Sequence, residues 1–199
     1  NSTDSNFSFI NYSSVTTTTN AYATLSQATY YWRVRAEDNA SNYTLSPTPY
    51  TILIDTTVPS VPVLSTPING YTTNQMNLTF SWSASDDSGF RGGSGINGYE
   101  FYISTTSDFS VFTSSEFTTA TSAYTTLSER VYYWRVRSQD IANNYSLFPT
   151  PYSLMIDTTP PTIIDNQPGD DQWRNNPGTT YNVDFEDKLS RLHTLQYTI

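Results

Sequence analysis

The chain of 199 residues contains no cysteine, one lysine, one histidine and two methionines. Without cysteine there are no disulfides, so each module must bury an apolar core of its own. Zinc sites built from cysteine and histidine are excluded too. With His193 as the only histidine, a nucleophile and its general base cannot be assembled elsewhere. We expect no enzymatic activity and no organic cofactor. The one enzymatic alternative is an acid pair formed among Asp86, Asp87 and Glu100.

Basic residues and long apolar runs are also scarce. Nine lysine and arginine residues stand against 18 aspartate and glutamate residues, which gives a net charge of −9 at pH 7. This balance argues against nucleic acid and anionic membranes as partners, because both call for basic surfaces. No apolar run approaches the roughly 18 residues of a membrane span, so we expect no membrane insertion in this segment. Lys188 is the single lysine, which disfavours covalent links between subunits through lysine.

Strand-forming and turn-forming residues are abundant instead. Serine and threonine together number 58, and tyrosine and asparagine number 16 each. These residues favour strands and turns over helices. The composition therefore predicts an all-β protein with almost no helix, located outside the cell or on the cell surface.

A segment near the start of the chain returns 102 residues later. Tyr30 to Pro59 and Tyr132 to Pro161 are identical at 20 of 30 positions. Such a repeat indicates tandem copies of one small module. It predicts the back half of a module at residues 1–56, a complete module at residues 57–157, and the front half of a further module at residues 158–199.

The two partial segments look complementary. Placed tail to head, they are about as long as the complete module, and Leu195 to Ile199 followed by Asn1 to Ser8 resembles Tyr99 to Ser110. The chain is then either one period of a longer polypeptide or a separate subunit that exchanges strands with its copies. Head-to-tail contacts of this kind generate filaments unless they close into a ring. Arbitrary boundaries of the segment are a third explanation.

Apolar residues alternate along the predicted strands of the complete module. This period of two predicts one buried face on each strand. The expected inward residues are Leu78, Phe80, Trp82, Ile96, Tyr99, Phe101, Ile103, Tyr132, Trp134, Val136, Tyr152, Leu154 and Ile156. The strands end at Asp55 to Pro59 and at Asp157 to Pro161, where proline makes a short, semi-rigid link. We expect the modules to form a linear array.

These residues resemble the fibronectin type III and bacterial immunoglobulin-like families. The features are Trp82 on one strand, Gly98-Tyr99 opening the next, and Leu127 followed by Tyr132-x-Trp134-x-Val136 at the position of the tyrosine corner. The Asp157-Thr-Thr-Pro-Pro161 linker is similar to those between repeats of large secreted or surface-anchored prokaryotic proteins. The resemblance covers the whole chain and implies tandem β-sandwich domains. The front half at residues 158–199 departs from it, since Phe185 and its neighbours provide no equivalent of Trp82.

Modules of these families serve as spacers, adhesin stalks, filament bodies and accessories of secreted hydrolases. The resemblance and the repeat together suggest a structural repeat unit of an extracellular filament or a giant cell-surface protein. Its partners would be copies of itself, head to tail and also side by side. The alternative is an adhesin stalk or a carbohydrate-binding accessory module with a surface glycan as partner, which a flat, exposed row of aromatic residues would favour.

Calcium is the metal that this composition permits, because it binds six to eight oxygen ligands. The candidate ligands are Asp55 and Asp157 at the strand ends and Asp86 and Asp87 in a loop. Asp38 and Asp140, at matching positions in a second loop of each repeat, are candidate ligands as well. No EF-hand spacing occurs. These aspartates can equally cap turns and remain solvated. A bound calcium ion would stiffen the junctions between modules.

Two further groups of residues are candidates for contacts or modification. Outward tyrosine and arginine side chains repeat on exposed strand faces, where they can grip neighbours or sugars or pair across the strands. They are Tyr31, Arg33, Arg35, Tyr133, Arg135 and Arg137. Asparagine residues in Asn-x-Ser/Thr sequences are candidate glycosylation sites. The four selected are Asn11, Asn42, Asn77 and Asn144.

Overall fold

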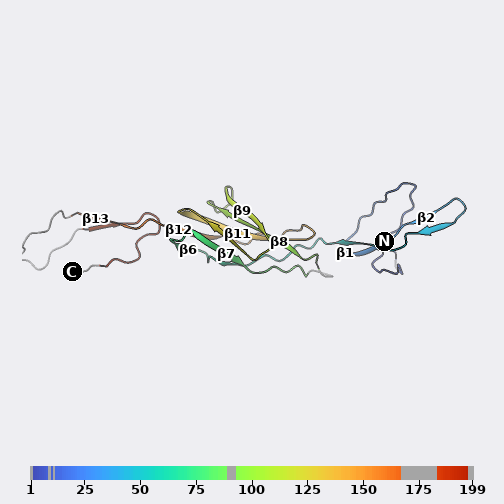
Figure 1. Ribbon diagram of the computed structural model, residues 1–199, viewed down its shortest axis with the longest axis horizontal. Coiled ribbons are helices and arrows are strands. Elements are labelled where there is room, and N and C mark those ends of the chain that lie inside the picture. The colour runs from blue at the N-terminus through green and yellow to red at the C-terminus, as the bar shows by residue number, and fades with distance from the viewer. Residues whose placement is uncertain (1, 9, 11, 89–92, 167–182, 197–199) are drawn as a thin grey trace, which may run out of the picture. The chain divides into compact units, whose positions relative to one another are not determined.

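The computed structural model describes the chain except for residues 1, 9, 11, 89–92, 167–182 and 197–199. Its described part consists of strands and loops, with no helix (Figure 1). This confirms the all-β fold class. In keeping with this, the described residues contain no helix long and apolar enough to span a membrane.

The described residues form fourteen strands. They are β1 (Ala28–Trp32), β2 (Arg35–Glu37), β3 (Tyr43–Leu45), β4 (Tyr50–Ile54), β5 (Leu64–Thr66), β6 (Tyr71–Thr73), β7 (Asn77–Trp82), β8 (Ile96–Ser104), β9 (Phe112–Thr118), β10 (Ser122–Thr126), β11 (Arg130–Asp140), β12 (Tyr152–Ile156), β13 (Thr162–Asp165) and β14 (Val183–Glu186).

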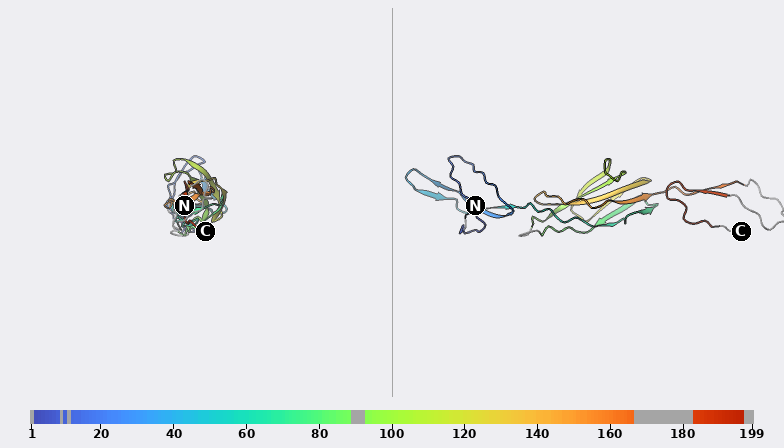
Figure 2. Two further views of the ribbon diagram at one scale, coloured as in Figure 1. Left: turned by 90° about the vertical axis from the view of Figure 1, so that its left-hand side faces the viewer. Right: turned by 180° about the vertical axis from the view of Figure 1, so that it is seen from behind.

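Two sheets make up the complete module. One has the strand order β10-β7-β5 and the other has the order β6-β12-β11-β8-β9. β10, β7 and β5 pair antiparallel, as do β11 and β12, whereas β12 and β6 pair parallel. Figure 2 shows these strands from the end and from behind. Two sheets whose inner faces meet form a β-sandwich.

Aromatic side chains fill the core between the two sheets. The ring centroids of Phe80 and Phe101 lie 5.0 Å apart, and those of Phe80 and Trp134 lie 5.2 Å apart. Trp82 stacks on Phe101 at 5.8 Å. The residues expected to face inward on β7 and β11 are all buried, as are Tyr99, Phe101 and Ile103 on β8 and Leu154 and Ile156 on β12. Ile96 at the start of β8 and Tyr152 at the start of β12 are only half-buried. The period-two prediction is therefore confirmed except at these two strand ends, because every second residue within the strands faces the opposite sheet.

The chain divides into two compact units. The first comprises Asn1–Pro62, Ala84–Tyr99 and Arg137–Leu147, and the second comprises Val63–Ser83, Glu100–Val136 and Phe148–Ile199. The first unit holds the β1–β4 ladder, the β2–β3 hairpin and the loops that follow β7 and β11. The second unit holds the three-stranded sheet and the antiparallel pair of β13 and β14. The predicted boundaries at residues 56 and 157 remain predictions.

The repeat in sequence is also a repeat in structure. β1 pairs with β4 in the register Trp32 to Tyr50, and β11 pairs with β12 in the register Trp134 to Tyr152, which is the same pairing 102 residues later. Each repeat also ties the tyrosine hydroxyl at its tyrosine corner to a serine four residues earlier. The Tyr132 hydroxyl lies 3.0 Å from Ser128 Oγ, and the Tyr30 hydroxyl lies 3.1 Å from Ser26 Oγ.

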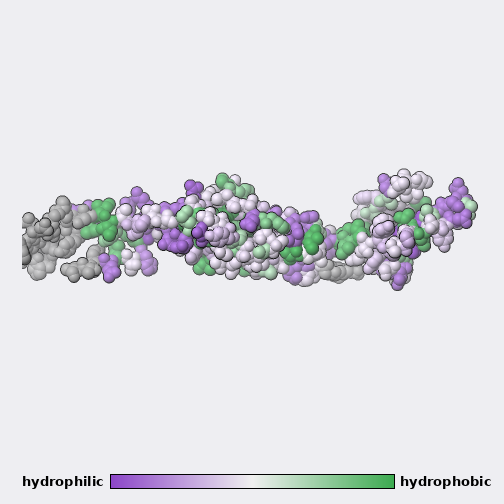
Figure 3. Space-filling view, in the orientation of Figure 1, coloured by the Kyte–Doolittle hydropathy of each residue, from purple (hydrophilic) through white to green (hydrophobic). Residues whose placement is uncertain are grey.

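The matching strands differ in burial. Trp134 is fully buried, whereas Trp32 at the matching position is 37% exposed. Val136 is fully buried, whereas Val34 is 56% exposed. Figure 3 shows hydrophobic side chains reaching the surface over β1, and over β13 in the second unit. The strands of residues 1–56 thus expose side chains whose counterparts form the core of the complete module. We call this surface, centred on Trp32 and Val34, the open face.

Asp108 holds the turn between β8 and β9. Its Oδ1 accepts hydrogen bonds from the Ser110 backbone N–H at 3.0 Å and from the Ser110 hydroxyl at 2.8 Å. These two bonds, together with one from the Thr106 hydroxyl, lower the pKa of Asp108 to about 2. The next residue, Phe109, is buried with a φ of 58° and lies 3.9 Å from the Arg135 guanidinium.

We expect the contribution of Asp108 to stability to disappear in acid. A carboxyl group with a folded pKa near 2 and an unfolded pKa near 3.9 stabilises the fold above about pH 4, and this stabilisation is lost as the pH falls through about 2. Thermal unfolding measured between pH 5 and pH 2 should therefore show a smaller loss of stability in Asp108→Asn than in the wild type. Glu116→Gln, an exposed change on β9, serves as the control and should keep the wild-type profile. Parallel profiles for Asp108→Asn and the wild type would contradict the expectation.

Candidate functional site

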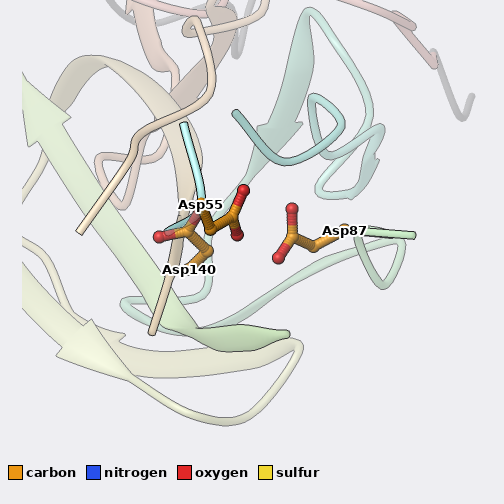
Figure 4. Close-up of side chains that lie close together, drawn as sticks. All are labelled: Asp55, Asp87 and Asp140. Carbon is orange, nitrogen blue, oxygen red and sulfur yellow. The ribbon is translucent and has the colours of Figure 1, made fainter. Parts of the chain in front are cut away.

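Three aspartates converge within the first unit. The ligand atoms offered by Asp55, Asp87 and Asp140 all lie within 4.8 Å of one another. Asp55 follows β4, Asp87 lies in the loop after β7, and Asp140 ends β11. Figure 4 shows the three carboxylates facing one another. We refer to these residues as the acidic triad.

Asp55 is fixed by two backbone N–H groups. Its Oδ2 accepts a hydrogen bond from Ser94 N at 2.6 Å, and its Oδ1 accepts one from Thr57 N at 3.0 Å. The Ser94 bond, followed by the Thr57 bond, lowers the pKa of Asp55 below its usual value. Asp55 is therefore ionised at neutral pH.

Asp140 is fully buried and is held by a single residue. Asn144 donates its backbone N–H to Asp140 Oδ1 at 2.7 Å and its side-chain Nδ2–H to Asp140 Oδ2 at 2.8 Å. The same Nδ2 lies 3.2 Å from the Asp55 carbonyl oxygen, to which it also donates. Asn144 therefore links two members of the acidic triad.

Asp87 has one carboxylate oxygen that is satisfied and one that is not. The side chain is only 7% exposed, and its Oδ2 accepts a hydrogen bond from Gly95 N at 2.7 Å. Its Oδ1 is buried without a hydrogen-bond partner among the described residues. A Cβ atom at Gly93 would collide with the Asp87 carbonyl oxygen, so the loop requires glycine there. Buried polar atoms are nearly always paired, so the Oδ1 atom calls for an explanation.

The charges of the acidic triad are also unbalanced. In the described part of the chain, no ion pair joins any of the three carboxylates to lysine, arginine or histidine. Two like unit charges 4.8 Å apart repel by roughly 3.5 kcal/mol at an effective dielectric constant of about 20. Such repulsion is tolerated where a cation or a proton is shared among the groups.

Part of this arrangement recurs in the second unit. Asp157 Oδ1 accepts a hydrogen bond from Thr159 N at 3.0 Å and Oδ2 accepts one from Ser190 N at 2.9 Å, as Asp55 does from Thr57 and Ser94. The Ser190 hydroxyl bond is the main cause that lowers the pKa of Asp157. Ser190 also donates to Asp187, which stands where Asp87 stands in the first unit. Asp157 and Asp187 thus repeat two of the three positions of the acidic triad.

The third position has its counterpart in residues 1–56. Asp38 accepts hydrogen bonds from Asn42 N at 2.9 Å and from Asn42 Nδ2 at 3.0 Å, which is the bonding of Asp140 with Asn144. Unlike Asp140, Asp38 is exposed. The Asn42 side-chain bond is the main cause that lowers the pKa of Asp38.

The chain resembles, in sequence, part of a much longer enzyme. It is 33% identical over 146 residues to Exoglucanase B from Cellulomonas fimi, and this match covers 70% of the chain and 12% of the relative. No protein-family model matches the chain. The complete module has two facing β-sheets and a tyrosine corner. It is a two-sheet β-sandwich, and in these features it resembles fibronectin type III-like modules.

Two solved structures are similar to the chain over more than half of its length. The fibronectin(III)-like modules of Clostridium thermocellum CbhA match with 17% identity and a TM-score of 0.40, which covers 66% of this chain and 64% of that one. A β-1,2-glucanase from Parabacteroides distasonis matches with 18% identity and a TM-score of 0.33, which covers 58% of this chain and 16% of that one.

Another candidate metal ligand in the complete module, Asp86, does not belong to the acidic triad. It is exposed, and its backbone pairs with Ser60, whose N–H donates to the Asp86 carbonyl at 2.8 Å. The Asp86 carboxylate accepts a hydrogen bond from the Ser88 hydroxyl. Asp86 and Asp87 are neighbours in sequence, yet only Asp87 faces the other two carboxylates.

The repeated arginines lie against aromatic rings of other segments of the chain. Arg33 lies 4.3 Å from the Phe7 ring, as Arg135 lies 3.9 Å from Phe109. Arg137 lies 4.3 Å from Tyr145. Arg35 pairs with Glu37 at 2.7 Å. Tyr31 and Tyr133 are half-buried. These contacts stabilise the sheet surface through cation–π attraction, and the role of these residues in gripping a neighbour or a sugar stays a prediction.

The candidate glycosylation sites differ in the hydrogen bonds that their side-chain amide groups make. Asn11 lies outside the described residues. The amides of Asn42 and Asn144 donate to Asp38 and Asp140. Asn77, at the exposed start of β7, accepts a hydrogen bond from Thr126. His193 is exposed and lies 3.1 Å from the Thr194 hydroxyl.

Proposed function

We propose that the chain is a non-catalytic structural segment of an extracellular protein built from many modules. In this proposal the half modules complete each other head to tail, with residues 158–199 of one repeat covering residues 1–56 of the next. The modules then transmit position and tension along a filament or stalk. Each repeat contacts the next through the same pair of surfaces, so the assembly extends as a linear array.

The open face is the observation that carries this proposal. Trp32 and Val34 are exposed, while Trp134 and Val136, in the same register of the same strand pair, are fully buried. In the complete module the covering layer comes from the front half of that module, including Leu78, Phe80 and Trp82. Exposed apolar surface of this kind is characteristic of an interaction face.

The partial copies of the acidic triad support the same pairing. Asp157 and Asp187 supply two positions of a triad, and Asp38 with Asn42 supplies the third. The two sets lie on the two segments that complete each other in the proposal. Joining the segments therefore rebuilds the core and the acidic triad in one step.

Sedimentation velocity of the 199-residue chain at increasing concentration tests the proposal. We expect the sedimentation coefficient to rise with concentration, and we expect Trp32→Ser to reduce this association. Leu147→Ser is the matched control, because Leu147 is 79% exposed in a loop outside the open face. A chain that stays monomeric at every concentration would overturn head-to-tail completion. The mass of the native polypeptide under full denaturation then separates individual subunits from one long covalent array.

A carbohydrate-associated accessory module is the second candidate, favoured by the sequence similarity to Exoglucanase B. Its test is co-sedimentation of the chain with insoluble cellulose. Retention on cellulose that Trp32→Ser leaves intact would favour this candidate over the structural one. The structural proposal expects no retention.

A further inference from the structure

We propose that Asp55, Asp87 and Asp140 bind one calcium ion, which fastens the end of β4 to the two loops that follow β7 and β11. The site lies within the first unit and does not depend on the head-to-tail proposal. It selects Asp140 in place of Asp86 and Asp157 among the aspartates that the sequence offers as ligands.

The first argument is the unpaired oxygen. Asp87 is more than nine-tenths buried, and its Oδ1 has no hydrogen-bond partner among the described residues. Figure 4 shows the Asp87 carboxylate turned towards Asp55 and Asp140. An ionised oxygen buried beside two other carboxylates is strongly unfavourable unless a cation occupies the space between them.

The second argument is the kind of donor. The acidic triad offers carboxylate oxygens, and the sequence has no cysteine and no histidine near Asp55, Asp87 or Asp140. A set of carboxylates and water suits a hard cation, and Ca–O distances of about 2.3 to 2.6 Å place opposite ligands up to about 5 Å apart. The ligand atoms of the acidic triad lie within 4.8 Å of one another. Calcium therefore fits without rearrangement, with water completing its coordination.

The third argument is that the ligands are held in place before an ion arrives. Ser94 and Thr57 fix both oxygens of Asp55, Gly95 fixes Asp87, and Asn144 fixes both oxygens of Asp140. A site whose ligands are fixed by neighbouring donors loses less entropy on binding. The bound ion then links three segments that are far apart in sequence.

Calorimetric titration of the chelator-treated, full 199-residue chain with CaCl2 tests the proposal. We expect binding that Asp87→Asn weakens on the order of 10- to 100-fold. Asp86→Asn is the matched control, since it removes the same charge from the adjacent, exposed residue, and it should bind calcium like the wild type. Asp55→Asn provides a second ligand variant in case Asp87→Asn folds poorly.

Thermal unfolding gives a second test, because the change in melting temperature caused by Asp87→Asn should have opposite signs in chelator and in calcium. In chelator, Asp87→Asn should melt above the wild type, because one of three repelling charges is gone. In calcium it should melt below the wild type, because a ligand is gone. The proposal would be overturned if titration of the wild-type chain with CaCl2 gave no binding heat and calcium left its melting temperature unchanged. An equal response to MgCl2 alone would overturn it too. Arg91 lies outside the described residues, and its positive charge is the alternative to calcium as the partner of the three carboxylates. A calcium response that appears only in Arg91→Ala would therefore also overturn the proposal.

Discussion

Trp134→Ala will destabilise the complete module by about 3 to 5 kcal/mol, whereas Trp32→Ala at the matching position will cost well under half of that. Trp134 is fully buried and packs on Phe80 and on Tyr152, with centroid distances of 5.2 and 5.8 Å. Trp32 stacks on Tyr50 at 4.8 Å, its one ring contact among the described residues, and is 37% exposed. Truncation leaves a cavity in the first case and little more than exposed surface in the second.

Amide hydrogen exchange measures the two effects separately, which matters because a chain of two units need not unfold in one step. Exchange should accelerate in β11 and β12 for Trp134→Ala and barely change in β1 and β4 for Trp32→Ala. Trp134→Phe keeps an aromatic ring in the core and should lie between the wild type and Trp134→Ala. Equal destabilisation by the two alanine variants would mean that the open face is covered within a single chain.

Asn144→Ala will cost about 1 to 3 kcal/mol, because it removes the side-chain hydrogen bonds to Asp140 Oδ2 and to the Asp55 carbonyl and leaves a buried carboxylate oxygen unpaired. Asn42→Ala is the matched change in the exposed copy of the same turn. Water can replace the lost bond to Asp38 there, so we expect a much smaller cost than for Asn144→Ala.

Chemical denaturation of unglycosylated protein in chelator compares these two asparagine variants without a contribution from calcium. Their difference should shrink if the chain is associated, because the Asp38 turn then becomes buried like the Asp140 turn. A cost for Asn42→Ala as large as that for Asn144→Ala in dilute, monomeric protein would contradict the exposure of the first turn.

The sequence predicted much of the fold because its signals are local and occur twice. The alternation at Leu78, Phe80 and Trp82 depends only on the pleat of one strand, and each of these residues is buried. The pair Tyr132 and Trp134 identified the long strand β11 in the same way. Exposure of Trp32 could not be predicted from alternation, since it depends on whether an opposite sheet is present.

The acidic triad was predicted less completely, because it depends on how loops meet. Asp55, Asp87 and Asp140 were all candidates, but the sequence cannot tell which of two adjacent loop residues, Asp86 or Asp87, faces the other carboxylates. Asp187 was not a candidate at all. It precedes Ser190 by three residues whereas Asp87 precedes Ser94 by seven, so the different loop lengths hide the correspondence that the hydrogen bonds show.

The positions of the acidic triad along the chain also set an order of events during biosynthesis. Its members stand at residues 55, 87 and 140, so the third carboxylate emerges only when β11 has been completed. Until then the earlier strands can pair, and the three like charges cannot yet be brought together. The close approach of the three charges is therefore postponed to the final docking of long-range contacts, which is the slow stage of folding for a β-sandwich. A cation that binds at that moment would stabilise the module only after it has assembled correctly.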